Sequence, residues 1–228
     1  MKGKARRIKE MLYYDQRIVP VHGDANATVF LINEAPGPCE AYEGIPLVGT
    51  QGGNLYRALR KAGIGWANQF DNFAWPSKTM KDYKSPDKMQ NRFELREKFL
   101  ALRAKYIACS NAFPRWPRPD KDSNDWVAPE CKEVLRKSNI ARLRKEILPN
   151  HRVILVCGAH AWLACFGESL SRPARKERRR FNKEELDKIN KRFSSKFSDG
   201  WYMGHTRRWS LNADSTPRVL KKVARIAW

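Results

Sequence analysis

Four short apolar segments without polar alternation lie at wide intervals along the chain. A run of this kind is typical of a strand that is covered on both faces of a sheet. The segments that we expect to form strands are Thr28 to Ile32, Tyr106 to Cys109, Arg152 to Val156 and Trp201 to Met203. Because helical stretches separate them, the order of elements predicts a three-layer α/β/α fold with a central, mostly parallel sheet of four strands.

Helical periodicity and helix-start signals mark the segments between these strands. The helices that we expect cover Gly53 to Ala62, Phe93 to Ala104, Ala128 to Leu148 and Ala159 to Phe166. Thr216 and Pro217 predict the start of a last helix, since proline is tolerated in a first turn. Asn182 followed by Glu185 has the pattern of a capping box and predicts a further helix after it.

The chain reads as one domain over residues 1–228, because 228 residues of which 42% are hydrophobic can bury a substantial core. Two regions fit the α/β scheme poorly. Residues 66–104 are rich in Lys, Asn and aromatic side chains, and residues 168–198 carry a strongly basic block. We interpret both regions as insertions into the single domain.

The net charge of the chain limits the classes of molecule that are expected to bind it. The 45 Lys and Arg exceed the 24 Asp and Glu by 21, and such a charge attracts polyanions, either nucleic acid or an anionic membrane. A solvated basic surface without a dedicated ligand is the alternative. The longest apolar runs, Val29 to Ile32 and Val153 to Cys157, are too short to span a bilayer, and the first residues lack the apolar stretch of a signal peptide. We therefore expect no membrane partner and an intracellular location, either cytoplasmic or nucleoid-associated, or nuclear if the source is eukaryotic.

The five cysteines are odd in number and widely spaced, and no two of them form a C-x-x-C pair. This pattern indicates neither a disulfide framework nor a zinc site. Most of them are expected to be small apolar core residues, and Cys157 at the end of a strand run is the clearest case.

Polar residues follow three of the expected strands. Glu34 stands in a Pro/Gly loop after the first strand, Asn111 ends the second, and His205 follows the fourth. In open α/β sheets ligands bind at the carboxyl ends of the strands, so parallel and adjacent strands would bring these three side chains into one cleft. Each also has a structural alternative: an ordinary surface loop for Glu34, a turn-capping amide for Asn111 and a structural histidine for His205.

Four motifs in a fixed order resemble those of the uracil-DNA glycosylase superfamily, particularly its family 4 branch. They are EAPG with EGIPLVG and GGNL, then SNAFP, then RVILVCGAHAWLACFG, and finally GHTRRWSLN. Family 4 proteins show GEAPG with G-x-PFVG and G-x-LL, then T-N, then LG-x-x-A, and finally an H-P-S loop. Order and approximate spacing are kept across residues 27–215, and it is the combination that is specific.

The resemblance implies a DNA glycosylase that hydrolyses the N-glycosidic bond of a damaged or deaminated base, uracil first of all, in base-excision repair. Such a reaction builds positive charge on the sugar and negative charge on the departing base. By the resemblance, His205 would donate a hydrogen bond to the anionic base. Glu34 would orient the attacking water and stabilise the cationic sugar, and Asn111 would read the edge of the base through its amide.

The resemblance also implies residues that hold the base and the DNA. The base-binding residues would be Ala35, Pro36, Gly37, Leu47 and Asn111. The target base must be flipped out of the stack, and the segment after His205 would supply the wedge and the phosphate contacts. The DNA-binding residues would be Arg207, Arg208, Trp209 and Ser210. The alternative for Trp209 is a place in the core, with the arginines solvated.

The chain departs from the family 4 pattern in three places. Leu47 stands where that branch has an aromatic residue that stacks on the flipped base; an apolar side chain can still cover a base face, but the stacking contribution of about 1–3 kcal/mol would be smaller. Asn33 replaces the glycine before the acid, and His205-Thr206-Arg207 replaces H-P-S. Two alternatives therefore stay open: a catalytically inactive nucleic-acid-binding protein on the same scaffold, and a glycosylase for another modified base such as hypoxanthine.

The four-cysteine iron–sulfur ligand set of family 4 cannot be built from this chain, because residues 1–38 contain no cysteine. We therefore expect no iron–sulfur cluster, no catalytic metal and no other cofactor. The branch of the superfamily that traps DNA covalently uses a histidine after T-N, and residues 112–127 contain none. The expected protein is a monomer with DNA as its partner.

Overall fold

The centre of the molecule is a mostly parallel sheet. The computed structural model describes residues 18–70, 75, 86–115, 128–171, 178–206, 209 and 215–228. Within these ranges the sheet has five strands in the order β2-β1-β3-β5-β4. They are β1 (Val29–Asn33), β2 (Ile107–Asn111), β3 (Val153–Val156), β4 (Arg179–Arg180) and β5 (Asp199–Tyr202). The expected fold class is confirmed, since β2, β1, β3 and β5 are parallel to one another.

The expected number of strands is wrong, because the sheet has five and not four. The additional strand, β4, pairs antiparallel with β5, Arg179 opposite Tyr202 and Arg180 opposite Trp201. Two consecutive arginines carry no apolar run, so hydrophobic patterning could not predict this strand. β4 lies within residues 168–198, and the description of that region as an insertion stays a prediction.

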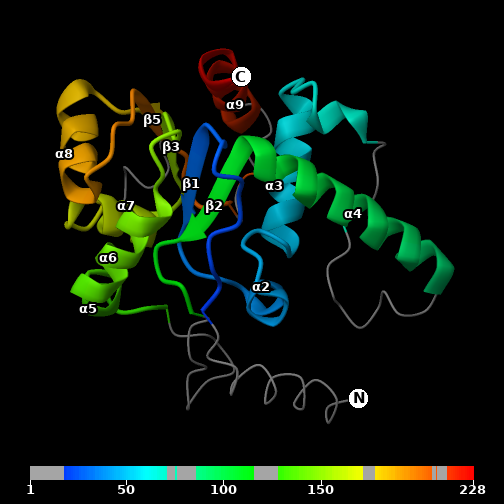
Figure 1. Cartoon of the computed structure of the whole chain (residues 1–228), viewed down its shortest axis with the longest axis horizontal. Helices are drawn as coiled ribbons and strands as arrows, with labels where there is room; N and C mark the ends of the chain where they lie inside the picture. The colour runs from blue at the N-terminus through cyan, green and yellow to red at the C-terminus, as the bar shows by residue number, and fades with distance from the viewer. Residues whose placement is uncertain are drawn as a thin grey trace, which may run out of the picture.

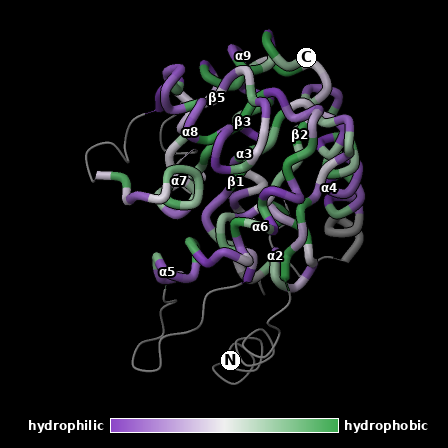
Figure 2. The backbone as a smooth tube through the Cα atoms, turned by 60° about the vertical axis from the view of Figure 1, so that its left-hand side comes forward, coloured by the Kyte–Doolittle hydropathy of each residue, from purple (hydrophilic) through white to green (hydrophobic). Residues whose placement is uncertain are grey.

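Side chains alternate across the sheet and fill two separate cores. Val29 and Leu31 of β1 lie in one buried cluster, and Phe30 and Ile32 lie in the other. Because a strand points successive side chains to opposite faces, a run that is apolar throughout requires a cover on both faces. Figure 2 shows the resulting pattern, with hydrophobic residues along the central strands and mixed hydropathy along the helices.

Two layers of helices provide that cover (Figure 1). On the face of Val29 lie α3 (Thr50–Lys61), α4 (Pro86–Tyr106), η1 (Ala67–Gln69) and α9 (Ser215–Ala227). On the face of Phe30 lie α5 (Cys131–Val134), α6 (Lys137–Glu146), α7 (Ala159–Phe166) and α8 (Lys183–Phe193). The short helix α2 (Pro38–Glu43) follows β1 at the edge of the sheet.

The segment from Ala128 to Leu148 forms two helices where one was expected. The chain leaves helical geometry at Arg136, whose ψ is 133°. The side chain of Asn139 stabilises this break, because its Nδ2 donates to the carbonyl oxygen of Val134 at 2.7 Å. Asn139, at the start of the second helix, thus hydrogen-bonds the last carbonyl of the first helix. The first helix can therefore end without leaving that carbonyl unpaired.

The capping box at the start of α8 is confirmed. The amide of Glu185 donates to Asn182 Oδ1 at 2.9 Å, and the amide of Asn182 donates to Glu185 Oε2 at 3.1 Å. α4 is longer at both ends than expected and buries Phe99 and Leu100 in the first core. The region 66–104 thus contributes core residues, and its description as an insertion stays a prediction.

Candidate active site

Four polar side chains meet at the carboxyl edge of the sheet. Glu34 follows β1, His160 lies in the first turn of α7 after β3, and His205 follows β5. β1 and β2 are in register, so that Asn33 lies opposite Asn111. Adjacent parallel strands therefore bring Glu34, Asn111 and His205 to one edge, as the sequence predicts.

The carboxylate of Glu34 is held by donors from two further elements. Its Oε1 accepts hydrogen bonds from the backbone amides of Ala159 and, at 3.4 Å, His160, both in the first turn of α7. Its Oε2 lies 3.1 Å from Nε2 of His205 and 3.8 Å from Nδ1 of His160. The side chain of the residue that follows β1 thus caps the N-terminus of α7, where unpaired amides and the helix dipole favour negative charge.

Gly158 makes room for this carboxylate. A Cβ atom at Gly158 would collide with the side chain of Glu34. Gly158 also has a φ of 97°, in the region that L side chains rarely adopt. Both the backbone conformation and the contact with Glu34 therefore require glycine at the start of α7.

The environment of Glu34 keeps it ionised. Burial acts to raise the pKa of this carboxyl, but His160 and His205 beside it outweigh burial and hold the pKa well below its usual range. Glu34 is therefore a carboxylate at neutral pH, fixed in position and 19% exposed. Such a group can orient a water molecule and stabilise a neighbouring positive charge.

Asn111 is buried without a partner for its amide. Its exposed fraction is 0%, and within the described part of the chain neither Nδ2 nor Oδ1 has a hydrogen-bond partner. Most buried polar atoms in folded proteins are paired, and an unpaired one costs about 1–3 kcal/mol. Asn111 thus retains a donor and an acceptor that a ligand could satisfy.

The backbone at Asn111 is fixed from α6. Arg142 donates from Nη2 to the carbonyl oxygen of Asn111 at 2.6 Å, and from Nη1 to the Glu146 carboxylate at 2.7 Å. Asn139 accepts from Arg142 and donates from Nδ2 to the carbonyl oxygen of Ala112 at 2.6 Å. The end of β2 is therefore held rigidly, although the Asn111 side chain is not.

A cluster of buried side chains fixes the segment that carries His205. The hydroxyl of Thr206 lies within hydrogen-bond distance of both Asn33 Oδ1 (3.1 Å) and Gln51 Oε1 (2.5 Å). Nδ2 of Asn33 donates to the same oxygen of Gln51 at 2.8 Å. Nδ2 of Asn54 donates to the carbonyl oxygen of Thr206 at 3.0 Å. These bonds join β1, α3 and the segment after β5 directly beneath the site.

The comparison with protein-family models agrees with this geometry. The family described as the uracil DNA glycosylase superfamily matches residues 20–215, which include the whole sheet and all four polar residues at its edge. The chain belongs to the uracil DNA glycosylase superfamily. The comparison with curated proteins gives no match. Membership of this superfamily suggests a DNA glycosylase.

Within this superfamily domain, two departures from the family 4 motifs are coupled. Asn33 replaces a glycine and Thr206 replaces a proline, and their side chains contact each other. A glycine and a proline could not form this bond, because neither has a polar side chain. The two loops therefore keep a defined arrangement by a side-chain contact.

The segment around Leu47 is held by two buried charged residues. Leu47 has a φ of 55°, its amide donates to the carboxylate of Glu40, and its carbonyl oxygen accepts from Arg103 Nη1 at 3.0 Å. Arg103 is fully buried and also donates to the carbonyl oxygen of Pro46 at 3.0 Å. The Leu47 side chain packs in the first core with an exposed fraction of 0%.

Glu40 is a second buried carboxyl of this region. Burial raises its pKa to about 7, although hydrogen bonds from the amides of Gly37 and Leu47 and the charge of Arg103 act in the opposite direction. The amide of Gly37 is engaged by Glu40, so it is not available to a base or a phosphate in this structure. Of the other expected base-binding residues of this turn, Ala35 is half-buried and Pro36 is buried.

Trp209 takes the core position that was its alternative. Its exposed fraction is 2%, and its indole Nε1 donates to the carbonyl oxygen of Met203 at 3.1 Å. Its ring packs in the first core, against the face that α3 and α9 cover. Arg207, Arg208 and Ser210 lie outside the described residues.

Three residues of the site were not expected from the sequence. His160, Glu40 and Arg103 all act through tertiary contacts with residues far away in the chain. His160 follows the third strand just as Glu34 follows the first, so the strand-end rule applied to every strand finds it. Glu40 and Arg103 carry no such signal, because a buried charge cannot be told from a surface charge by its position in a helix.

The described residues contain no group of three or more His, Cys, Asp or Glu side chains placed to hold a metal ion. All five cysteines are free, and Cys109, Cys157 and Cys165 are buried. The expected core position of Cys157 is confirmed, and burial raises the pKa of its thiol well above the ordinary value. Among the helices that the structure describes, none is long and apolar enough to cross a membrane.

Proposed function

We propose that the protein is a monofunctional DNA glycosylase that hydrolyses the N-glycosidic bond of a deaminated base, with uracil as its first substrate, in base-excision repair. The observation that carries the proposal is the unpartnered amide of Asn111 at the strand end next to Glu34. A base-sized ligand with one donor and one acceptor on its edge would satisfy both atoms of that amide. Membership of the superfamily supports the same reaction.

Water supplies the atoms that complete the reaction. The C1′–N bond breaks with its electron pair on the base, and the water oxygen forms the new bond to C1′ and loses a proton. The base leaves as an anion that takes up a proton. Because Glu34 is ionised and fixed by α7, its role is to orient the water and stabilise the cationic sugar. His205, whose Nε2 lies 3.1 Å from Glu34 Oε2 in the absence of a base, would donate a hydrogen bond to the departing base.

The edge of the base is the feature that Asn111 would read. Uracil presents the same O4 acceptor as thymine, together with an N–H donor, whereas cytosine presents an amino donor at that position. The Asn111 amide accommodates uracil with Nδ2 toward O4 and Oδ1 toward N–H. The opposite orientation would suit cytosine, so the contacts that orient this amide in the complex would set the choice of base.

The cellular setting follows from the substrate. A DNA repair enzyme of this kind acts where the DNA is, cytoplasmic or nucleoid-associated in a bacterium or archaeon and nuclear in a eukaryote. The proposed enzyme works as a monomer on DNA without a metal, an iron–sulfur cluster or another cofactor. Flipping of the target base would bring it to Asn111, since the reacting bond is inaccessible inside a duplex.

The test is release of a base from defined oligonucleotides. Single- and double-stranded substrates containing uracil, hypoxanthine, xanthine or a modified thymine or cytosine are incubated with the protein, and abasic sites are detected by alkaline cleavage. We expect cleavage at uracil, lost in Glu34→Gln and kept in Glu184→Gln, a control at an exposed carboxylate of α8. Cleavage only at another base would change the proposed substrate but leave the proposed reaction as it is. No cleavage at any base would contradict the proposal and favour the inactive nucleic-acid-binding alternative.

A further inference from the structure

Two neighbouring helices of the first layer carry positive charge only. α3 contains Arg57, Arg60 and Lys61, and neither Asp nor Glu occurs between Thr50 and Lys61. α9 contains four cations and likewise no acidic residue: Arg218, Lys221, Lys222 and Arg225. The structure packs the two helices against each other through one buried cluster, on the same face of the sheet. We name this face, defined by these seven residues, the α3–α9 surface.

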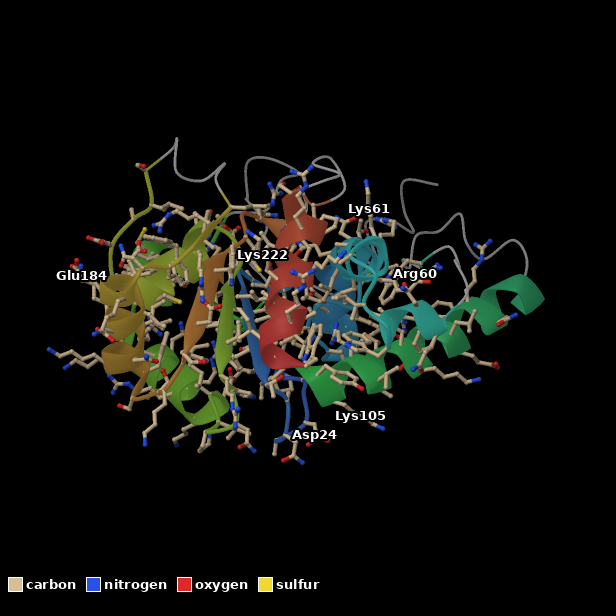
Figure 3. The ribbon with its side chains drawn as sticks, turned by 90° about the horizontal axis from the view of Figure 1, so that it is seen from above. Asp24, Arg60, Lys61, Lys105, Glu184 and Lys222 are labelled. Carbon is tan, nitrogen blue, oxygen red and sulfur yellow. The ribbon has the colours of Figure 1, made fainter. Side chains whose placement is uncertain are left out.

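The cations of α9 form a stripe opposite its buried face. Val219, Leu220 and Val223 are buried, whereas all four cations of the helix are exposed. Positions three or four residues apart lie on one side of a helix, at steps of roughly 5 Å along its axis. Figure 3 looks onto α9, with Lys222 projecting from it and with Arg60 and Lys61 on the neighbouring helix. The Nζ atom of Lys222 lies 5.8 Å from the centre of the Trp201 ring, and this contact supports the extended position of the lysine side chain.

The α3–α9 surface begins at the candidate active site. α3 starts at Thr50, three residues after Leu47, and α9 starts at Ser215, ten residues after His205. The start of α3 is joined to the segment that carries His205, because Asn54 of α3 donates to the carbonyl oxygen of Thr206. Arg57 donates to Asn54 Oδ1 at 2.5 Å, which places the first cation of α3 next to this link.

α8, on the opposite face, shows that the excess charge is unevenly distributed. Its sequence has four cations, Lys183, Lys188, Lys191 and Arg192, together with three carboxylates, Glu184, Glu185 and Asp187. Lys188 pairs with Glu184 at 2.9 Å, one turn away. Both helices expose cations, but only α9 presents them without neighbouring negative charge on the same helix.

From this distribution we infer that the α3–α9 surface binds the phosphate backbone of the DNA strand that leaves the active site. A stripe of cations at regular steps, without carboxylates, suits a linear polyanion, because each contact releases a condensed counterion. The inference rests on DNA as the substrate and extends the binding surface from the base pocket to the flank of the molecule.

The experiment measures the binding of DNA that contains no modified base, so it does not depend on catalysis. The test variant is Arg218→Gln with Lys221→Gln and Arg225→Gln, all at exposed positions of α9. The matched control is Lys183→Gln with Lys191→Gln and Lys196→Gln, exposed positions on and after α8. Both variants lower the net charge by three, so they reduce long-range attraction to DNA equally.

Dissociation constants are measured for a short and a long single strand over a range of salt concentrations. For the long strand we expect the test variant to weaken binding about tenfold or more at low salt, and to flatten the slope of log K against log salt by about 2, since each phosphate contact contributes about 0.7 to that slope. The control should keep the slope of the unmodified protein. For a strand that covers only the pocket, the two variants should bind alike.

Equal losses in the two variants would overturn the inference, because net charge alone would then explain them. An unchanged slope in the test variant would overturn it as well. Far-ultraviolet circular dichroism and thermal unfolding establish that both variants are folded, and glutamine keeps helix propensity close to that of lysine and arginine. Base release by the unmodified protein is measured separately, so a failure of the proposed catalysis is distinguished from a failure of this binding surface.

Discussion

The ends of β1 and β2 lie side by side in register, but the side chains of Glu34 and Asn111 there have opposite hydrogen-bonding environments. Glu34 accepts hydrogen bonds from two amides of α7 and lies beside two histidines, whereas the amide of Asn111 has no partner within the described residues. The carboxylate is fixed before any ligand arrives, and the amide keeps its hydrogen bonds for one. The end of β1 thus carries a preorganised carboxylate, and the end of β2 carries an amide whose hydrogen-bonding atoms are unused.

The largest expected effect concerns the fixed side chain. Glu34→Gln keeps the size of the residue but removes the charge that caps α7 and lies between His160 and His205. We expect the rate of base release to fall by about 10²–10⁴-fold. The free energy of unfolding should also fall by about 1–3 kcal/mol, because a buried charged acceptor is lost. Single-turnover cleavage and urea unfolding measure the two effects.

The lowered pKa of Glu34 also makes the stability of the protein depend on pH. A carboxyl whose pKa is lower in the folded state stabilises the fold above its unfolded pKa, and this contribution is lost as the pH falls below about 4.5 toward the folded value. The Glu34→Gln variant should therefore lose less stability than the unmodified protein in that acid range. Equal acid sensitivity would mean that the contacts of Glu34 do not stabilise its charge.

The second prediction concerns the unpartnered side chain. Asn111→Leu keeps the approximate volume and removes the amide, so base release should fall by about 10²–10³-fold. The free energy of unfolding should stay the same or rise, since an unpaired buried amide no longer has to be desolvated. Loss of activity with retained stability is the opposite of the double loss expected at Glu34.

Asn139→Leu provides a control for that substitution. Asn139 is also a buried asparagine, but it donates to the carbonyl oxygens of Ala112 and Val134 and accepts from Arg142. Its replacement leaves several buried groups unpaired and should lower the free energy of unfolding by about 2–4 kcal/mol. If Asn111→Leu were as destabilising as Asn139→Leu, the Asn111 amide would have partners, and the contrast with Glu34 would disappear.

A third prediction uses Glu40, a buried carboxyl whose pKa moves in the direction opposite to that of Glu34. Because burial raises the folded pKa of Glu40 to about 7, the folded protein binds a proton that the unfolded chain has released above pH 4.5. Stability should therefore decrease as the pH rises from about 4.5 to 7, by up to about 3 kcal/mol from this group. Glu40→Gln should remove that decrease, which thermal unfolding across this pH range measures.

The stability profile of Glu40→Gln shows whether hydrogen-bond donors or burial determine the opposite pKa shifts of Glu34 and Glu40. Glu40 accepts from two backbone amides and lies near Arg103, and His205 acts on it through charge alone, whereas His205 contacts the Glu34 carboxylate directly. A stability profile that Glu40→Gln leaves unchanged would show that two amides and a guanidinium are sufficient to keep a buried carboxylate ionised. The difference between the two residues would then not require the histidines.

The smallest expected effect concerns the contact between Asn33 and Thr206. In a double-mutant cycle of Asn33→Ala and Thr206→Val, we expect a coupling energy of about 0.5–2 kcal/mol in unfolding, since the two side chains share one buried bond network. The double variant should also lower the rate of base release more than its stability loss explains, because His205 precedes Thr206. Additive effects on unfolding would show that the two departures from the family 4 motifs are independent.

Local signals account for most of what the sequence predicted correctly. Buried strands have continuous apolar runs, and the capping box at Asn182 is complete within four residues. The positions of Glu34, Asn111 and His205 followed from a single topological rule about strand ends. β4 and the break at Arg136 were not predicted, because both depend on contacts with distant segments and neither has an apolar pattern of its own.

The side-chain environments in the site could not be read from the sequence. Whether an asparagine is paired, or a glutamate is ionised, depends on donors brought from elsewhere in the chain. Asn111 and Asn139 are the same residue type, both buried and both near the end of β2, yet among the residues that the structure describes only Asn139 finds partners for its amide. Trp209 shows the same limit, since the sequence favoured a DNA contact for a side chain that lies in the core.

The two borders of the sheet have a consequence for how the protein behaves in concentrated solution. An uncovered border strand offers a row of backbone groups on which a second chain can add and start an aggregate. Here the outer strand on one side is only two arginines long, and on the other side the segment before β1 bonds to β2 through His22 and Cys109. Short, charged or partly occupied borders discourage such addition, so the protein can reach a high local concentration without its sheets joining.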